Sequence, residues 1–412
     1  MNSKRIAIIG GGAAGLFAAA SLPECSDAEV VLFDKNPFFG KKLLITGKGR
    51  CNVTNDCDFQ EFFANVPQNG KFLYSALRRF SPADTIEFFE SCGVPLKTER
   101  GKRVFPASDK ASDIRDALVN LAKKNGVVFR FEKVKKIDKK GDIFSVMTDK
   151  STYFFEKVIV ATGGVSYPGT GSTGDGYVFA KKFGHTITSV SPSLVPLVTR
   201  ERFVTRLMGL SLKNVSLSIV DSTNDKTVYS DFGEMLFTHF GISGPLVLSA
   251  SSYVRDINAS PDRYKACIDL KPALSEEQLD SRVQRDFLER KNMQLDNALR
   301  KLLPEKIILP LLKKCGIDPE KQCNSVTKEE RNALVRTVKN FSLTVTGYRP
   351  ISEAIITDGG ICVKEINPKT MESKLINGLH FAGEIIDVAG FTGGFNLQIA
   401  FSTGYAAAHN EW

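Results

Sequence analysis

The glycine cluster near the start of the chain has the residue types and spacing of a phosphate-binding turn. Gly10, Gly12 and Gly15 fill the pattern G-x-G-x-x-G. In such a turn the first glycine permits a tight bend, the second lets the backbone approach a pyrophosphate, and the third lets the following helix pack on a strand. That helix would begin at Ala13, and its N-terminal amides and dipole would favour negative charge. The turn therefore predicts a dinucleotide site.

Two strands must position this turn. The apolar run Arg5–Ile9 suits a buried parallel strand, and a second strand over 29–33 ends in Asp34. An acidic residue about 20 positions after the glycines is placed to accept hydrogen bonds from ribose hydroxyls. The unit by itself does not distinguish FAD from NAD.

A second G-x-G-x-x-G pattern spans Gly169–Gly174. No strand leads directly into it, because Ser166–Pro168 precedes it, and no acidic strand end follows at the right spacing. Its continuation, Thr173–Ala180, resembles the T-G-D-G-x-x-x-A turn of fumarate-reductase-like flavoproteins, where the glycines let the backbone pass close to the flavin. We expect a loop of the same flavin site here; a separate NAD(P) site is the alternative.

The loop Gly40–Asn55 reads GKKLLITGKGRCNVTN. It closely resembles the signature G-(R/K)-K-L-x-I-(S/T)-G-x-G-R-C-N-x-T-N of the BaiN/YhiN-like family of bacterial flavoproteins. Three further blocks extend the resemblance in the expected order, namely Ala161–Gly164, Gly233–Pro245 and Phe381–Gln398. Members of this family are described as NAD(P)/FAD-dependent oxidoreductases, so the resemblance implies an FAD-dependent enzyme. Asp34 is a departure, because related folds more often have glutamate there.

The resemblance also implies a fold and a set of binding residues. The fold is α/β, with a Rossmann-like FAD-binding domain of the glutathione-reductase-like, two-segment kind and an inserted β-rich and helical domain. FAD would be bound without a covalent link, and NAD(P)H would bind only transiently as an electron donor. Motifs and resemblance together give these expected cofactor-binding residues: Gly10, Gly12, Ala13, Ala14, Gly15, Asp34, Lys35, Lys41, Lys42, Thr46, Gly47, Arg50, Cys51, Asn52, Val134, Ala161, Thr162, Gly163, Gly383, Glu384, Asp387, Gly394, Phe395, Asn396 and Leu397.

Three side chains are candidates for chemistry beyond cofactor binding. His239 could contact substrate or transfer a proton, with a structural role as the alternative. Cys51 lies in a basic loop that could lower its pKa, with packing beside the flavin as the alternative. Arg349 could hold an anionic substrate or form a surface ion pair. The eight cysteines form no C-x-x-C pair and the four histidines are far apart, so no metal site is expected.

Changes of pattern along the 412 residues predict three segments. Residues 1–191 would form the first part of the FAD-binding domain. Residues 192–343 would form an inserted substrate or cap domain, β-rich over 192–273 and helical over 274–340. Residues 344–412 would close the FAD-binding domain.

Composition gives weaker constraints. The chain is 42% hydrophobic and 25% charged, as is usual for globular proteins. Lys4 and Arg5 precede an apolar run, but the glycine cluster interrupts it, so we expect an uncleaved cytoplasmic protein. The net charge of +9 could favour anionic ligands. The densest basic cluster, Lys133–Lys140, suits a solvated strand edge. We expect a small-molecule substrate and neither a membrane nor a nucleic-acid partner; the sequence does not indicate an oligomeric state.

Three functions remain open at this point. The first is reduction of an activated double bond, or of a similar small molecule, with NAD(P)H as donor. The second is oxidation of an amine or amino acid by oxygen. The third is a non-catalytic module or a flavoprotein that acts on nucleic acid, which the positive charge suggests.

Overall fold

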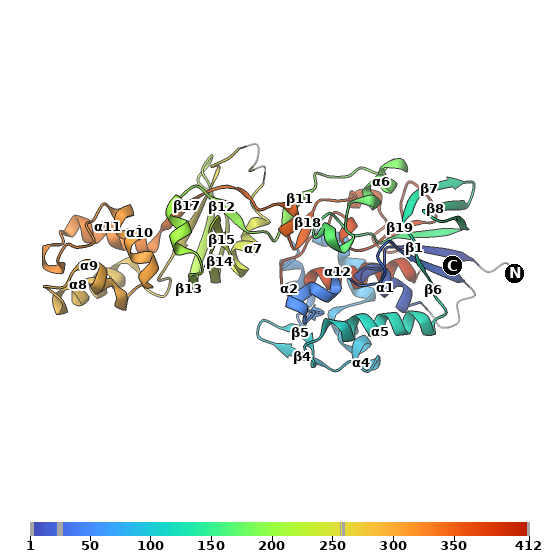
Figure 1. The fold of residues 1–412 in the computed structure, drawn as a ribbon, viewed down its shortest axis with the longest axis horizontal. Coiled ribbons are helices and arrows are strands. Elements are labelled where there is room, and N and C mark those ends of the chain that lie inside the picture. Colours follow the sequence, from blue (N-terminus) through green and yellow to red (C-terminus); the bar gives the residue numbers. More distant parts are fainter. Residues whose placement is uncertain (1–3, 23–27, 256, 258–259, 410–412) are drawn as a thin grey trace. The chain divides into compact units, whose positions relative to one another are not determined.

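The computed structural model describes residues 4–22, 28–255, 257 and 260–409, and the chain divides into two compact units (Figure 1). Unit 1 comprises residues 1–192 and 351–412, and unit 2 comprises residues 193–350. Each unit has its own cluster of buried apolar side chains. In the part of the chain that is described, no helix has the length and apolar character needed to cross a membrane.

A five-stranded parallel sheet forms the centre of unit 1. Its order is β19-β10-β1-β2-β6, so the first strand of the chain lies in the middle and a strand from the closing segment lies at one edge. Strand β1 is almost wholly buried, as its continuous apolar run predicts. The strands are β1 (Arg5–Ile9), β2 (Glu29–Asp34), β6 (Val128–Phe131), β10 (Lys157–Val160) and β19 (Leu379–Phe381).

Helices α1 (Ala13–Ala20) and α12 (Phe395–Ala408) join the two ends of the chain. Both are rich in small apolar residues and buried along most of their length. They cross closely at Gly404, where an added Cβ atom would lie 2.6 Å from the carbonyl oxygen of Ala14. Helix α5 (Ala111–Lys124) also packs against α1.

Smaller elements complete unit 1. Strands β7, β8 and β9 form an antiparallel meander, and β3, β4 and β5 form a second small sheet. Helix α4 begins at an N-cap where Ser81 and Asp84 form a reciprocal capping box. The bounds are β3 (Thr54–Asn55), α2 (Phe59–Ala64), α3 (Tyr74–Arg79), α4 (Pro82–Ser91), β4 (Leu96–Glu99), β5 (Arg103–Pro106), β7 (Val134–Lys140), β8 (Ile143–Thr148), β9 (Thr152–Phe155), α6 (Asp175–Lys182) and β18 (Ile356–Asp358).

Unit 2 contains a closed antiparallel barrel with the strand order β12-β15-β14-β13-β16-β17. A group of helices lies in the sequence between strands β16 and β17. The barrel strands are β12 (Leu197–Thr199), β13 (Ser211–Asp221), β14 (Lys226–Phe237), β15 (Gly241–Ser243), β16 (Tyr264–Asp269) and β17 (Phe341–Tyr348). The helical elements are η4 (Arg202–Leu207), α7 (Pro245–Ser251), α8 (Glu276–Glu289), α9 (Leu295–Ala298), α10 (Glu305–Cys315) and α11 (Lys328–Lys339).

The boundaries differ from those expected. The first lies between residues 192 and 193, one residue later than proposed. The second lies between residues 350 and 351, so assigning residues 344–350 to the closing segment is wrong. The reason is strand β17, which pairs with β12 and β16 and thereby closes the barrel.

Candidate cofactor site

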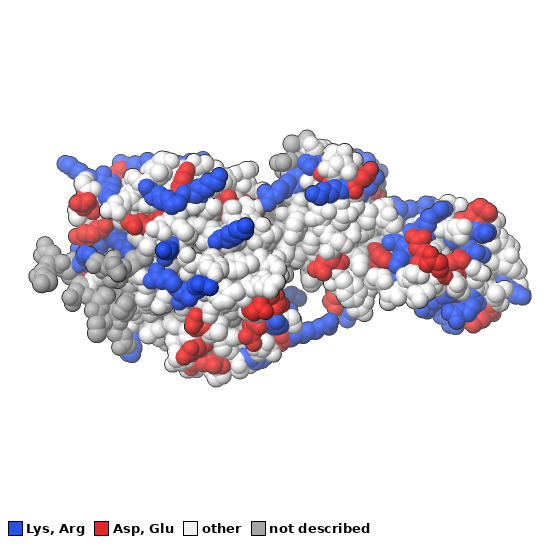
Figure 2. Space-filling view, turned by 180° about the vertical axis from the view of Figure 1, so that it is seen from behind, with Lys and Arg blue, Asp and Glu red and all other residues white. Residues whose placement is uncertain are grey.

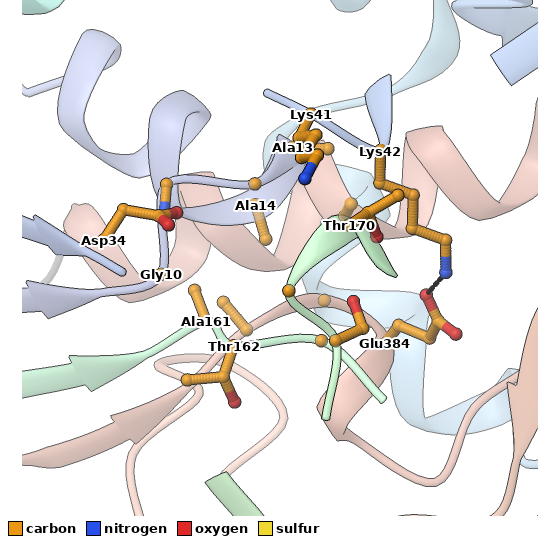
Figure 3. Close-up of a pocket in the computed structure, with 18 of the residues that line it drawn as sticks. Gly10, Ala13, Ala14, Asp34, Lys41, Lys42, Ala161, Thr162, Thr170 and Glu384 are labelled. Carbon is orange, nitrogen blue, oxygen red and sulfur yellow. Dashed lines mark hydrogen bonds and ion pairs between the residues drawn. The ribbon is translucent and has the colours of Figure 1, made fainter. Parts of the chain in front are cut away.

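Unit 1 contains a cavity of about 200 Å³ where the phosphate-binding turn faces the closing segment (Figure 3). Segments that are far apart in the sequence line it together. They include the glycine turn, the end of β2, the basic loop after it, the start of β7, the end of β10, the second glycine pattern and the closing segment. Seventeen of the expected cofactor-binding residues line this cavity: Gly10, Gly12, Ala13, Ala14, Asp34, Lys35, Lys41, Lys42, Thr46, Val134, Ala161, Thr162, Gly163, Gly383, Glu384, Asn396 and Leu397.

The glycine turn has the geometry that its pattern predicts. Gly10 adopts a left-handed conformation with φ of 103°, and a Cβ atom there would lie 2.5 Å from the carbonyl oxygen of Ala161. A Cβ atom at Gly15 would lie 1.9 Å from the carbonyl oxygen of Gly10, so Gly15 lets α1 pack on the turn. At Gly12, by contrast, a Cβ atom would meet nothing within 4 Å. The backbone at Gly12 is therefore open to a ligand in the cavity.

Asp34 fixes this turn from the end of β2. One carboxylate oxygen accepts a hydrogen bond of 2.7 Å from the backbone amide of Gly11, and the other accepts one of 2.7 Å from that of Asn36. The side chain lines the cavity beside Gly10 (Figure 3). Asp34 therefore orients the phosphate-binding turn, and it faces the space where a ribose would lie.

A charged cluster lies on the opposite side of the cavity. Lys42 Nζ donates to Glu384 Oε2 and to Ser166 Oγ, both at 2.6 Å, and Ser166 Oγ donates to Glu384 Oε1 at 2.6 Å. The backbone amide of Thr357 donates to the same Oε1 at 2.8 Å. Burial alone would raise the pKa of Glu384, but the charge of Lys42 and these hydrogen bonds hold it below its ordinary value. The cluster is thus an ion pair between Lys42 and a carboxylate.

Two more lysines line the cavity. Lys35 Nζ forms an ion pair of 2.6 Å with Asp175 and a hydrogen bond to Thr173. Lys41 has no acidic partner among the residues described, and its Nζ atom points into the open part of the site (Figure 3). Lys41 is therefore the lysine most available to an anionic ligand.

These features suit a dinucleotide. The N-terminus of α1 and Lys41 offer positive potential for phosphates, and Gly12 leaves space beside the backbone. The hydroxyl of Thr162 is buried at the cavity wall without a hydrogen-bond partner. A buried polar atom without a partner inside a cavity indicates a group that a ligand can satisfy.

The second glycine pattern contributes to this same cavity. Thr170, Gly171, Ser172 and Asp175 line it together with the first glycine turn. Gly171 and Gly174 both have positive φ, and α6 follows at once. The pattern therefore belongs to a shared site, as its sequence context predicts.

Helix α12 begins at the cavity wall. Gly394 has φ of 103°, and a Cβ atom there would lie 2.3 Å from the backbone of Thr54. The side chain of Asn396 closes the preceding loop through hydrogen bonds with the backbone of Gly390 and Phe391. Gln398 is buried and accepts hydrogen bonds from Thr54 and Thr85. These contacts fix the N-terminus of α12 beside the cavity.

Eight expected binding residues do not line the cavity: Gly15, Gly47, Arg50, Cys51, Asn52, Asp387, Gly394 and Phe395. Gly15 and Gly394 act through close backbone packing, as described above. Arg50 forms ion pairs with Glu99 and Asp109. Asp387 accepts a hydrogen bond of 2.6 Å from Gln68.

Of the remaining four residues, Cys51 is described with the catalytic candidates, and the other three have structural positions outside the cavity lining. Gly47 lies at a left-handed turn with φ of 56°. Phe395 packs edge-on against Phe62. The side-chain oxygen of Asn52 is buried without a hydrogen-bond partner.

The three candidate catalytic residues lie elsewhere. Cys51 is wholly buried, and burial raises the pKa of its thiol to about 12, so the expectation of a lowered pKa is wrong. Its basic neighbour Arg50 is paired with the acidic residues Glu99 and Asp109. His239 and Arg349 are in unit 2, where both contact Phe240. The ring centroids of His239 and Phe240 are 4.9 Å apart, and the guanidinium carbon of Arg349 lies 4.5 Å from the centroid of the Phe240 ring. Neither lines the unit 1 cavity.

The sequence motifs did not identify the segment Ile355–Thr357, which lines the cavity. The hydroxyl of Thr357 accepts hydrogen bonds from the backbone amides of Val165 and Ser166, so it ties the closing segment to the loop that follows β10. The following pair Gly359-Gly360 was an available signal. A Cβ atom at Gly359 would lie 2.1 Å from the carbonyl oxygen of Ser189, which is the kind of close approach that requires glycine.

Metal binding finds no support in the described residues, where no group of three or more His, Cys, Asp or Glu side chains is placed to hold an ion.

The chain is similar to known proteins over nearly its whole length. Residues 4–410 match the family model described as the HI0933-like protein Rossmann domain. The chain is 33% identical to a ribosomal RNA dihydrouridine synthase of Escherichia coli K12, over 98% of this chain and 96% of that protein. It is 34% identical to a protein of the same name from Haemophilus influenzae, over 97% and 96%. It is 31% identical to the 3-dehydro-bile acid delta(4,6)-reductase of Clostridium scindens, over 98% of both chains.

The family resemblance inferred from the motifs is confirmed, and so are the Rossmann-like fold class and the assignment as a flavoprotein oxidoreductase. The match spans both segments of unit 1 and the whole of unit 2. The chain belongs to the HI0933-like Rossmann-domain family.

Proposed function

We propose that unit 1 binds FAD without a covalent link and that the enzyme reduces an activated carbon–carbon double bond, with NAD(P)H as electron donor. The observation that carries this proposal is similarity over the full chain to relatives named for dihydrouridine synthesis and for a delta(4,6)-reductase. Both names correspond to two-electron reduction of a double bond conjugated to a carbonyl group. Bound FAD would supply the hydride, and the protein would supply orientation and electrostatics.

The cavity residues would divide FAD between them. The amides at the start of α1, together with Lys41, would bind the pyrophosphate, and Asp34 would accept hydrogen bonds from the ribose. The backbone of Val134 would contact the adenosine. The ion pair of Lys42 and Glu384 would hold the ribityl chain of FAD, which joins the phosphates to the flavin ring, because this ion pair links the basic loop to the closing segment.

Helix α12 would act on the flavin ring. Its 14 residues give a full dipole, and its N-terminus lies at the cavity wall. Positive potential there would favour the negative charge of a reduced flavin. Asn396 and Leu397, which line the cavity from the first turn, would contact the ring.

As substrate we propose a uracil base of ribosomal RNA. Its C5–C6 double bond is conjugated to the C4 carbonyl, so hydride and proton addition would yield dihydrouridine. Two relatives bear that name, and the net charge of +9 suits a polyanionic substrate. This proposal departs from our expectation that nucleic acid is not a partner. The second candidate is a small conjugated ketone, which the name of the Clostridium relative favours.

A defined assay separates these functions. The purified, FAD-loaded protein would be mixed anaerobically with NADPH or NADH while flavin absorbance is followed, and then with ribosomal RNA from a strain that lacks the gene. Mass spectrometry of RNA digests should show dihydrouridine. Reduction of a steroid dienone without any change in RNA would favour the second candidate. Reduction only by an amine, with peroxide on reoxidation, would identify an oxidase, and a protein that takes up no FAD would refute the proposal.

Gly12→Val tests whether this cavity is the cofactor site. A Cβ atom at Gly12 meets nothing within 4 Å, so the variant should fold, yet its side chain would fill the space proposed for the pyrophosphate. We expect FAD affinity to fall at least about tenfold, while the circular dichroism spectrum stays unchanged. Unaltered FAD binding by a folded Gly12→Val protein would exclude this cavity as the cofactor site.

A further inference from the structure

Unit 2 carries an exposed group of basic side chains on two elements, η4 and α10. We call this group the η4–α10 surface and define it by Arg202, Arg206, Lys306, Lys313 and Lys314, all of which are exposed. Lys306 and Lys313 lie two turns apart on the same face of α10. The opposite face of α10, including Ile307, Ile308, Leu311 and Leu312, is buried in the core of unit 2.

Contacts in the structure make these side chains one continuous surface. Elements η4 and α10 pack against each other. Lys306 Nζ donates to the carbonyl oxygen of Met208, which directly follows η4, at 3.1 Å. At the other end of α10, Lys314 Nζ donates to the carbonyl oxygen of Ser342 at 2.8 Å and lies 5.9 Å from the ring of Phe341. Phe341 in turn contacts Phe203 of η4, with ring centroids 5.9 Å apart.

The charge of this surface is not neutralised within the described structure. Arg202, Arg206 and Lys313 form no ion pair with any described acidic residue. The acidic residues on the same segments are engaged elsewhere, because Glu305 pairs with Arg300 and Glu201 accepts from the backbone amide of Thr344.

Four other basic residues of unit 2 are neutralised by acidic partners. Arg263, Lys321, Arg331 and Lys339 each form an ion pair of 2.7 Å or shorter with an acidic residue of the same unit. On the face drawn in Figure 2, basic and acidic side chains lie interspersed over the helical part of unit 2. The η4–α10 surface thus gathers exposed basic side chains without ion pairs to described acidic residues on two elements that pack together.

We infer that the η4–α10 surface binds the phosphate backbone of the RNA substrate. This inference rests on the proposed function and adds the surface that would hold the RNA. Several fixed cations without acidic partners are the recognised means of binding phosphates, and arginine and lysine on packed elements can do so without reading sequence. Among the described residues of η4, α10 and Met208, which follows η4, the exposed large apolar side chains are Met208 and Leu309, so the surface lacks the broad apolar face of a membrane-binding helix.

The test compares two variants of the full, FAD-loaded chain that lose the same charge. The first is Arg202→Gln, Arg206→Gln and Lys313→Gln, which spares Lys306 and Lys314 because they also support the packing. The control is Lys110→Gln, Lys135→Gln and Lys140→Gln, three exposed lysines of unit 1 that form no ion pair with a described acidic residue. Binding of a labelled ribosomal RNA fragment would be measured by anisotropy over a range of salt concentrations.

We expect the η4–α10 variant to bind RNA at least about tenfold more weakly, with a salt slope reduced by about 2 to 3, since each lost phosphate contact reduces it by about 1. The control variant should stay within about threefold of the unmodified protein. Equal losses in both variants would overturn the inference, because total charge alone would then explain binding. Loss of binding to phosphatidylserine vesicles, with RNA binding retained, would also overturn it.

The outcomes separate this inference from the proposed function. If the unmodified protein forms dihydrouridine and the η4–α10 variant does so with the same KM for RNA, the surface is wrong and the function stands. If the unmodified protein reduces only a small conjugated ketone and binds no RNA, the RNA function and the surface both fail.

Discussion

The ion pair between Lys42 and Glu384 shows how single residues join the two ends of the chain. The two side chains are each 21% exposed and come from positions 342 residues apart. Removing one partner of such a pair leaves the other charge without compensation in a poorly hydrated site, which costs more than the pair itself contributes. The pair is therefore a means of fixing the basic loop against the closing segment.

Cys51 leads to a prediction at the same scale. Its thiol is buried, and burial raises its pKa to about 12, so very little thiolate exists near neutral pH. We expect iodoacetamide at pH 7.5 to leave Cys51 unmodified in the native protein and to modify it fully in urea, as peptide mass spectrometry would show. The Cys51→Ser variant should keep its FAD content and its rate of substrate reduction within about threefold. Rapid native-state labelling of Cys51, or loss of turnover in a folded, FAD-loaded variant, would restore it as a catalytic candidate.

Sequence patterns predicted the cavity residues where backbone geometry requires a particular residue type. Gly10, Gly12 and Asp34 were found because the turn and the strand end impose their spacing. Thr357 was not found, since its role depends on hydrogen bonds to residues about 190 positions earlier. The lowered pKa considered for Cys51 was wrong, because this pKa depends on burial, which a basic neighbouring sequence does not reveal.

At the scale of elements, the helix pair α1 and α12 determines how closely the two segments of unit 1 approach. Short side chains along both helices permit a close crossing, and Gly404 is its tightest point. The sequence predicted the helix that begins at Ala13 from its place directly after the glycine turn. The crossing itself could not be predicted, since nothing in the spacing of Gly404 shows that it meets Ala14.

Gly404→Val tests this crossing. A Cβ atom at Gly404 would lie 2.6 Å from the carbonyl oxygen of Ala14, so the helices must separate. We expect the free energy of unfolding to fall by about 3 kcal/mol, measured by urea unfolding followed by circular dichroism. Gly347→Val is the control, because a Cβ atom there meets nothing within 4 Å and valine suits its strand. Equal stability of the two variants would show that α1 and α12 do not cross as described.

At the scale of the molecule, two units with separate cores arise from one chain. The expected inserted domain was recognisable because strand-like and then charged helical patterns interrupt the flavin motifs. Its end was placed too early because β17 pairs with β12 and with β16, at sequence separations of about 150 and 80 residues. Such long-range pairing leaves no signal in local composition.

The same pairing predicts that unit 2 folds by itself. Leu197 of β12 lies opposite Tyr348 of β17, so the two ends of the unit are adjacent strands of a closed barrel. Its buried apolar cluster is made of its own residues, and a unit with its own core can in principle fold alone. We expect a fragment of residues 193–350 to unfold in urea in one cooperative transition. Circular dichroism and tyrosine fluorescence should give the same midpoint. Leu343→Ala, which removes a buried β17 side chain, should lower the urea midpoint, because such truncations cost about 2–5 kcal/mol. A fragment without a cooperative transition would mean that the barrel needs residues of unit 1 to close.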